Sequence, residues 1–242
     1  MLPVHPAAAA LVPTARRFGR TAPAATDRPP APTARPAPAG SPSPGRGHPS
    51  TAVSGKLRSM AAQQPLDFAQ ITRPLELTAE LRDQLVDCWV RVINAGGAVI
   101  PRGLPMPPVS TGQADPALGL LVGGLDPRRA RMLIATAGGR LAGWLVLRRD
   151  PHPLVAHCGA VNHVMTHPDF RGRGIGTALM HRVSDLARQE MGLEQLHIAV
   201  RAGLGLEEFY GRLGWREIGR WPGGLRVAPG DDRDEILMYL AL

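Results

Sequence analysis

The stretch "DFRGRGIGTALMHR", residues 169–182, decides how this sequence is interpreted. It places three glycines, Gly172, Gly174 and Gly176, between a segment with strand character and the first turn of a helical pattern. Glycine lets the backbone approach a ligand closely and adopt conformations that other residues resist. Exposed N–H groups and the dipole at a helix N-terminus also favour anions. The stretch therefore predicts an anion-binding turn, with Arg171 beside it to add positive charge.

Two familiar nucleotide-binding loops do not fit this turn. A Walker loop needs a lysine followed by Ser or Thr, and residues 172–177 contain no lysine. The glycines are spaced GxGxG and not GxGxxG, so the dinucleotide fingerprint fails as well. The next strand ends in Arg201, where that fingerprint would place a ribose-binding acid. Nucleotide binding of either type is not predicted.

Hydrophobic periodicity and turn residues on both sides predict the order of elements. Thr78 is suited to cap the first helix, and Gly138-Gly139 is a hairpin signal. The order β-α-α-β-β-β-α-β-α-β-β indicates one α/β domain with a mixed sheet, over residues 63–242. The expected elements are a strand from residue 66, a helix over 78–97, a loop over 98–112, a short helix within 115–129, a hairpin over 131–150, a strand over 157–168, a helix over 175–191, a strand over 193–201, a short helix within 205–215, and strands at 216–221 and 234–242.

Two motifs resemble those of the GNAT superfamily of N-acetyltransferases. "VMTHPDFRGRGIGTALM" is similar to its strand, RxxGxG loop and helix, and "FYGRLGW" is similar to its later helix and corner. The element order agrees with the resemblance. It implies acetyl-CoA as cosubstrate, with the pyrophosphate on the glycine-rich turn and the pantetheine arm on the preceding strand. The implied cofactor residues are Val164, Thr166, Arg171, Gly172, Arg173, Gly174, Ile175, Gly176 and Thr177.

Tyr210 matches the general acid of the family. A phenol is protonated at neutral pH and can supply a proton to a leaving thiolate. Leu206, Phe209 and Leu213 share a helix face with Tyr210, which also suits a core residue. The sequence leaves both roles open.

The general base is harder to assign. Many relatives hold an acid at the positions of Ala160 and Ala199, and alanine cannot accept a proton. Asn162 shares a strand face with Ala160 and is the candidate to orient a water molecule. His163 has a suitable pKa but the opposite strand parity unless a bulge intervenes, and His197 shares a face with Ala199.

The two cysteines, Cys88 and Cys158, provide neither a disulfide framework nor a metal quartet, which fits a reducing, cytoplasmic compartment. Cys158 also offers an alternative route through an acyl-cysteine. No metal is expected. No apolar run approaches the roughly 18 residues of a membrane span, so a membrane role is not expected either.

Residues 1–62 form a Pro-, Ala- and Arg-rich extension that is predicted to be disordered, because it has little to bury. Residues 1–60 carry eight Lys or Arg against one acid, so most of the net charge of +8 lies there. A transit peptide and a nucleic-acid arm are the alternatives. Proline density opposes the first, and the near absence of aromatics opposes the second. The main expectation is a dispensable extension, with Met60 as a second candidate start.

The resemblance implies transfer of an acetyl group from acetyl-CoA to a primary amine, with a small molecule such as an antibiotic or toxin as the expected acceptor. Acidic residues near the last strands are candidates to attract a cationic amine: Glu207, Glu208, Asp231, Asp232, Asp234 and Glu235. The alternative is a catalytically silent acyl-CoA-binding domain. No nucleic-acid partner is expected, and a homodimer is left open.

Overall fold

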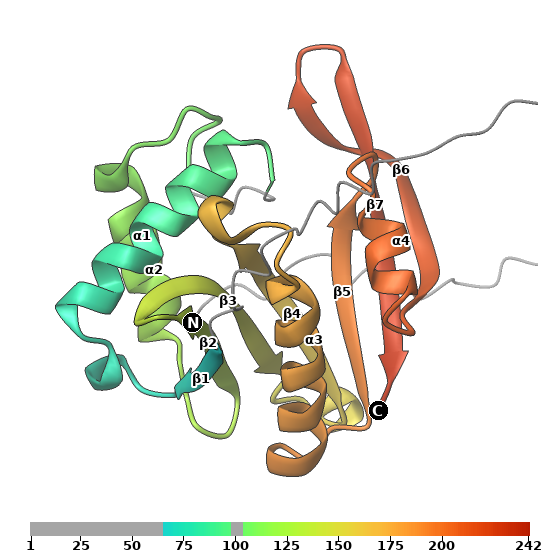
Figure 1. Ribbon diagram of the computed structural model, residues 1–242. Coiled ribbons are helices and arrows are strands. Elements are labelled where there is room, and N and C mark those ends of the chain that lie inside the picture. The colour runs from blue at the N-terminus through green and yellow to red at the C-terminus, as the bar shows by residue number, and fades with distance from the viewer. Residues whose placement is uncertain (1–64, 98–103) are drawn as a thin grey trace, which may run out of the picture. The chain divides into compact units, whose positions relative to one another are not determined.

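A seven-stranded mixed sheet in the order β1-β2-β3-β4-β5-β7-β6 organises the chain (Figure 1). The computed structural model describes residues 65–97 and 104–242, and the predicted extension over residues 1–62 lies outside them. The strands are β1 (Leu66–Ile71), β2 (Ala130–Ala137), β3 (Arg140–Arg149), β4 (Cys158–Thr166), β5 (Gln195–Arg201), β6 (Arg216–Ala228) and β7 (Asp231–Ala241). The helices are α1 (Ala79–Asn94), α2 (Thr111–Gly123), α3 (Ile175–Asp185) and α4 (Leu206–Gly211), with short helical turns η2 (Pro74–Glu76), η3 (Pro153–Val155), η4 (Pro168–Phe170) and η5 (Leu186–Glu190). The order of strands and α-helices is the predicted one.

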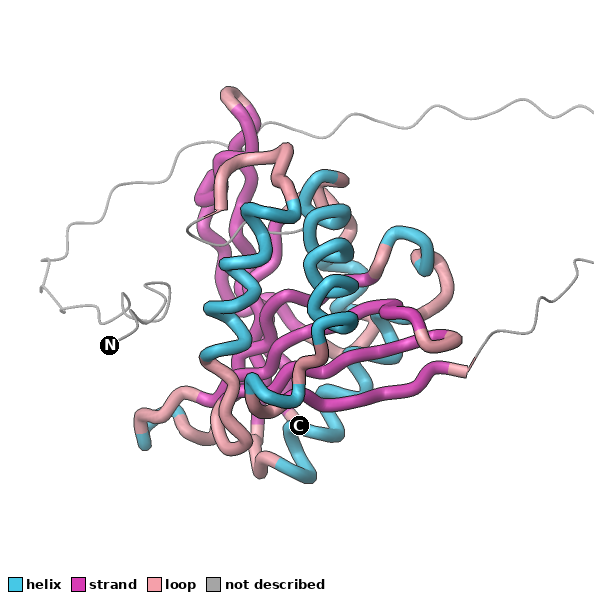
Figure 2. The backbone as a smooth tube through the Cα atoms, turned by 90° about the vertical axis from the view of Figure 1, so that its left-hand side faces the viewer, coloured by secondary structure: helices cyan, strands magenta, loops and turns pink. Residues whose placement is uncertain are grey.

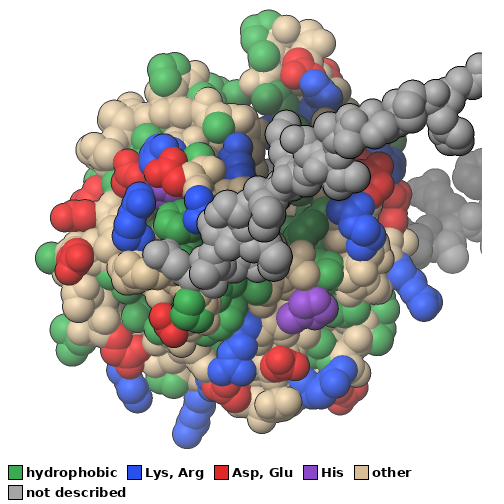
Figure 3. Space-filling model, in the orientation of Figure 1, with side chains coloured by type: hydrophobic (Ala, Val, Ile, Leu, Met, Phe, Trp, Pro, Cys, Tyr) green, Lys and Arg blue, Asp and Glu red, His purple; other side chains and the backbone are tan. Residues whose placement is uncertain are grey.

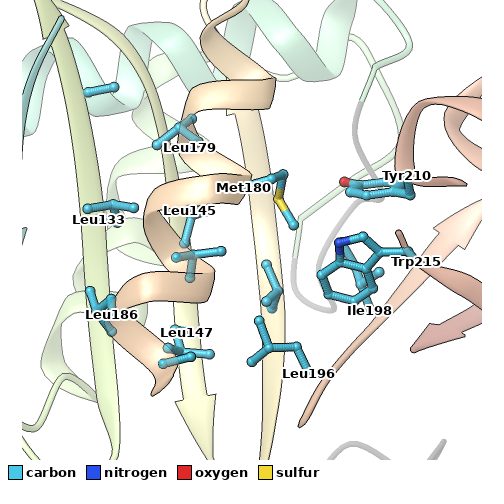
Figure 4. Close-up of a cluster of buried hydrophobic side chains, with 14 of the residues drawn as sticks. Leu133, Leu145, Leu147, Leu179, Met180, Leu186, Leu196, Ile198, Tyr210 and Trp215 are labelled. Atoms are coloured by element: carbon cyan, nitrogen blue, oxygen red, sulfur yellow. The ribbon is translucent and has the colours of Figure 1, made fainter. Parts of the chain in front are cut away.

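The helices cover both faces of the sheet, α1 and α2 on one side and α3 and α4 on the other (Figures 1 and 2). Side chains of β3 alternate between two buried clusters, as the period of two in a strand requires. Trp144 and Val146 pack with α1 and α2. Leu145 and Leu147 pack with α3 (Figure 4). The near-continuous apolar run of β3 thus reflects burial on both faces.

Local sequence signals explain where α1 and α2 begin. The Leu81 N–H donates to the Thr78 hydroxyl at 3.2 Å, as predicted for the cap of α1. Helix α2 begins at Thr111, earlier than predicted, because Ser110 and Gln113 form a capping box ahead of its apolar residues. The predicted loop over 98–112 was therefore too long at its C-terminal end.

The last two strands are also longer than predicted, since β6 runs to Ala228 and β7 starts at Asp231. The predicted strand ended at residue 221, just before Pro222. Strand β6 lies at the edge of the sheet, where proline and register shifts are tolerated. The acidic residues from Asp231 to Glu235 therefore lie within β7.

Strands β4 and β5 pair in parallel at three positions only, Cys158 with Gln195, Gly159 with Leu196 and Ala160 with His197. Beyond Ala160 they separate, toward the top of Figure 1. We call this opening the splay.

One prediction concerns the packing of α3 on the sheet. A Cβ on Gly143 of β3 would lie 2.6 Å from the Met165 carbonyl oxygen and 3.0 Å from Ile175 Cγ2. Gly143→Ala should therefore lower the free energy of unfolding by about 1–3 kcal/mol, measured by urea denaturation. Gly112→Ala in α2 is the control, because nothing lies within 4 Å of its added Cβ. Equal stabilities of the two variants would contradict the packing argument.

Candidate active site

A cavity of about 280 Å³ lies where β4, the glycine loop (residues 171–174), the start of α3 and helix α4 meet. Its lining includes every predicted cofactor residue except Arg173, and it includes the candidate acid Tyr210. Leu206 and Phe209 of α4 complete it. The sequence had assigned these two only to a helix face, because their approach to the loop depends on tertiary packing.

The backbone of the glycine loop is suited to an anion. Gly172 and Gly174 have φ angles of 74° and 78°, which residues with a Cβ rarely adopt. Gly174 is the N-cap of α3 and supplies no side-chain cap. The first backbone hydrogen bond of the helix runs from Ala178 N to Gly174 O at 3.0 Å. The N–H groups of the first turn therefore precede the helical ladder and stand at the cavity without a helix partner.

Gly176 serves a different purpose from the other two glycines. It has no positive φ. A Cβ there would lie 3.3 Å from Phe209 Cζ and 3.6 Å from Thr166 Oγ1. Its missing side chain lets α4 and β4 close around the start of α3, which gives the cavity its walls.

The two arginines of the glycine loop, Arg171 and Arg173, lie in different surroundings. Arg171 lines the cavity. The guanidinium of Arg173 lies 5.3 Å from the ring centroid of Phe170, in a cation–π arrangement, and Arg173 is not part of the lining. Of the predicted cofactor residues it is the one that the structure does not bring to the cavity.

An ion-pair network ties η4, just before the glycine loop, to α1. The Arg91 guanidinium donates to both carboxylate oxygens of Asp169, at 2.7 and 3.3 Å. The Asp169 N–H donates to Nδ1 of the buried His167 at 3.2 Å. The Arg91 hydrogen bond, the largest cause, holds the pKa of Asp169 below its usual value. Sequence reasoning missed this network, because Arg91 is 78 residues from Asp169 along the chain.

Tyr210 lies both in the core and at the cavity. Its side chain is 4% exposed and packs against Trp215, with ring centroids 5.8 Å apart. Figure 4 shows its hydroxyl directed toward α3, near Met180. Burial raises the pKa of the phenol, so it stays protonated well above neutral pH. The two roles left open by the sequence are thus compatible in one side chain.

A β-bulge interrupts β4 and changes which residues share a face. Trp144 pairs with Met165 and Val146 pairs with Asn162, so β4 holds one residue more than β3 between these pairs. His163 has a φ of 54°, and its ring stacks on Trp144 with centroids 5.6 Å apart. The bulge that the sequence left open is therefore present, and His163 faces the α1 and α2 side, as Asn162 does.

Neither histidine near the splay is a strong base. Burial, and secondarily the positive charge of Arg148, lower the pKa of His163 to about 4. Burial also lowers the pKa of His197. Asn162 donates to the Ala160 carbonyl at 3.3 Å and does not line the cavity. Both imidazoles are neutral at pH 7 and accept a proton poorly.

The acidic residues of β7 are largely offset by arginines. Asp232 pairs with Arg226 at 2.7 Å, Asp234 pairs with Arg220 at 3.0 Å, and Asp231 pairs with its neighbour Arg233. Hydrogen bonds from the Gly223 N–H and Arg220 keep the pKa of Asp234 low. The sequence expectation of a negative acceptor patch is weakened here. Figure 3 likewise shows acidic and basic side chains interspersed over the face in view.

Cys158 lies at the closed end of the splay, where β4 and β5 pair. The Gln195 side-chain amide donates to its sulfur at 2.8 Å. This position gives no support to the acyl-cysteine route. In the described part of the chain, no group of three or more His, Cys, Asp or Glu side chains is arranged to hold a metal. Nor does any described helix have the length and apolar character to span a membrane.

A mixed sheet that opens between two parallel strands, with an uncapped helix N-terminus beside the opening, offers a site for a ligand that carries an anionic group. Residues 107–215 match the model of the Acetyltransferase (GNAT) family. Residues 107–215 are therefore similar to the GNAT acetyltransferase family. No metal is implied by the residues that line the site.

Individual relatives agree with this assignment. An uncharacterised N-acetyltransferase of Methanocaldococcus jannaschii is 38% identical over 68 residues, which are 28% of this chain and 30% of that protein. A GCN5-related N-acetyltransferase from Kribbella flavida superposes with a TM-score of 0.59 at 21% identity, over 73% of this chain and 98% of that one. The ribosomal-protein-S18-alanine N-acetyltransferase of Escherichia coli gives 0.52 at 16% identity, over 73% and 94%. The structural matches establish the fold.

Proposed function

We propose that the protein transfers an acetyl group from acetyl-CoA to a primary amine. The observation that carries the proposal is the uncapped N-terminus of α3, which opens on a cavity that also contains Tyr210. One end of this cavity suits a diphosphate and the other supplies a protonated phenol. Similarity to the family supports the choice of acetyl-CoA as cosubstrate.

Binding follows from the groups that line the cavity. The pyrophosphate would accept hydrogen bonds from the first-turn N–H groups of α3, and Arg171 would add a charged contact. Val164 and Thr166 would place the pantetheine arm along β4, beside the splay. The polar backbone that β5 no longer pairs would be available to that arm, which has amides of its own.

The transfer itself requires a neutral amine. Its lone pair attacks the thioester carbonyl carbon, the C–S bond breaks, and the electron pair leaves on sulfur. Tyr210 donates its phenolic proton to the thiolate and is reprotonated from water. The amine loses its proton to solvent, either directly or through a water molecule held near Asn162. The nearby histidines are weak bases and the two alanines cannot accept a proton. Solvent is therefore the acceptor that fits the loss of the amine proton.

The proposed acceptor is a small molecule, in a cytoplasmic setting that the two free cysteines suit. Solved relatives include enzymes named for a ribosomal protein alanine, so similarity to the family alone does not choose between a protein and a small molecule. A silent acyl-CoA-binding domain is the second candidate. Ala160 and Ala199, which stand beside the splay and cannot accept a proton, are the observation that favours it.

The test is thiol release from acetyl-CoA by the full-length chain with a panel of amines, combined with mass spectrometry of the products. An acetyltransferase gives a product 42 Da heavier than its acceptor, with release above the rate of hydrolysis. Binding of acetyl-CoA in calorimetry without any acetylated product would instead favour the silent domain. An absence of both binding and product would contradict both candidates.

A further inference from the structure

The sheet face turned toward α1 and α2 carries a row of three residues at the closed end of the splay. Arg148 of β3 pairs with Ala160 of β4, and Ala160 pairs with His197 of β5. Residues paired across strands share a face. Arg148 therefore lies one strand away from the residue at which β4 and β5 begin to separate.

Arg148 has no counter-ion among residues 65–97 and 104–242. Neither an ion pair nor a hydrogen bond of its guanidinium is found there. Arg91, Arg220 and Arg226, by contrast, all have carboxylate partners. Burial is the cause of the lowered pKa of Arg148. A partly buried cation without a partner is costly, and an anionic ligand would offset that cost.

The guanidinium of Arg148 lies beside the C-terminal end of α2. Gly124, just after α2, has no side chain, and a Cβ there would lie 3.6 Å from Arg148 Nη1. His163 lies close enough for the charge of Arg148 to lower its pKa. The guanidinium therefore lies between the end of α2 and the bulge of β4, on the side of the sheet opposite the cavity.

Other charges on this face do not neutralise Arg148. Arg201, near the open end of β5, donates to the Gly96 carbonyl. Glu235 pairs with Arg201 in the strand register, four residues along β5 from His197. Glu235 thus lies toward the open end of the splay and Arg148 at its closed end.

We propose that Arg148 binds an anionic group of the acceptor, which is therefore an amine that also carries a carboxylate, as a free α-amino acid does. The proposal rests on the proposed function and specifies its acceptor, which would approach the splay from the face opposite the cavity. The planar guanidinium binds a carboxylate through two parallel hydrogen bonds. The amine, a few bonds away, then points toward the splay, where the thioester would lie.

The same charge assists the chemistry. A cation near an ammonium disfavours its protonated form and so increases the fraction of neutral amine. This effect matters in a site where Ala160 and Ala199 cannot accept a proton and where His163 and His197 are weak bases. Arg148 would thus act as a positioning residue for the amine, while Tyr210 contacts the leaving thiolate.

The first test compares matched acceptors with the full-length wild-type chain and acetyl-CoA. Each of a panel of L-amino acids is assayed beside its amide and its decarboxylated amine. At least one amino acid should show a kcat/KM about 10- to 100-fold above those of its two analogues, as expected for a lost charge-assisted hydrogen bond. Acetylation of the amides or amines at an equal or greater kcat/KM throughout the panel would overturn the proposal.

The second test uses Arg148→Gln, with Arg149→Gln as the matched control. Arg149 is the next residue on β3 and faces the opposite side of the sheet, so the control removes the same charge. Arg148→Gln should lower kcat/KM for the preferred amino acid by about 10- to 100-fold through KM, and leave its amide and the affinity for acetyl-CoA unchanged. A purely structural role at the end of α2 predicts lower thermal stability and equal losses for all acceptors, which would refute the proposal.

A binding measurement separates this inference from the proposed function. If no amine is acetylated, the proposed function fails, but calorimetry can still titrate the same amino acids and amides into the protein with coenzyme A. Binding of an amino acid that is lost in Arg148→Gln and retained in Arg149→Gln would support the anion site. An absence of amino-acid binding, or binding unaffected by Arg148→Gln, would overturn it.

Discussion

Gly174→Glu should abolish measurable binding of coenzyme A, with a loss of at least about 100-fold in affinity. Gly174 has a φ of 78° and caps α3 without a side chain. A glutamate there introduces bulk, backbone strain and a negative charge at the point where a diphosphate would approach the N–H groups. Two charge-assisted hydrogen bonds of about 1.5–3 kcal/mol each account for a loss of this size. Isothermal titration with coenzyme A measures it.

Gly192→Glu is the matched control for this variant. Gly192 also has a positive φ, of 59°, and nothing lies within 4 Å of an added Cβ at either position. It follows η5, at the other end of the helical segment that begins with Gly174. The control should lose a similar amount of stability and keep its affinity for coenzyme A. Unchanged affinity of a folded Gly174→Glu variant would show that the glycine loop is not the pyrophosphate site.

The features that the sequence predicted are those encoded locally. Gly172 and Gly174 were identified because a positive φ at a helix start leaves a glycine signature in a few consecutive residues. The Thr78 cap and the element order follow from similarly short patterns. The cavity also contains Tyr210, which was identified through a second short motif. These residues could be predicted because each of them belongs to a short motif of consecutive residues.

Features that depend on contacts between distant segments were not predictable. The counter-ions of Asp232 and Asp234 come from the paired strand β6, whose length was underestimated because its edge position was unknown. The bulge at His163 depends on the register between β3 and β4. That Arg148 has no partner in the described part of the fold can be seen only when the positions of all its neighbours there are known. These contacts join segments that are distant in the sequence, so no short motif indicates them.

Tyr210→Phe should lower kcat by about 10²- to 10⁴-fold while the affinity for acetyl-CoA stays near that of the wild type. The substitution keeps the ring that packs against Trp215 and Phe209 and removes the hydroxyl. Because burial raises the pKa of this phenol, the wild-type group carries its proton throughout the neutral range, although it is a weaker acid than a solvent-exposed phenol. The rate must be measured at saturating substrates where chemistry is limiting, because slow product release would conceal the loss.

Tyr239→Phe is the control for the loss of a phenol at the thiolate, since Tyr239 of β7 pairs with His197 on the other face of the sheet and is not part of the cavity lining. It should retain wild-type turnover. Both variants should melt close to the wild type, because the aromatic packing of Tyr210 is retained and a single hydroxyl contributes about 1 kcal/mol at most. A core role for Tyr210 predicts turnover within about threefold of wild type, equivalent to less than 1 kcal/mol in the barrier. That result would remove Tyr210 from the chemistry and leave protonation of the thiolate to water, whereas a loss confined to kcat assigns the proton to the phenol.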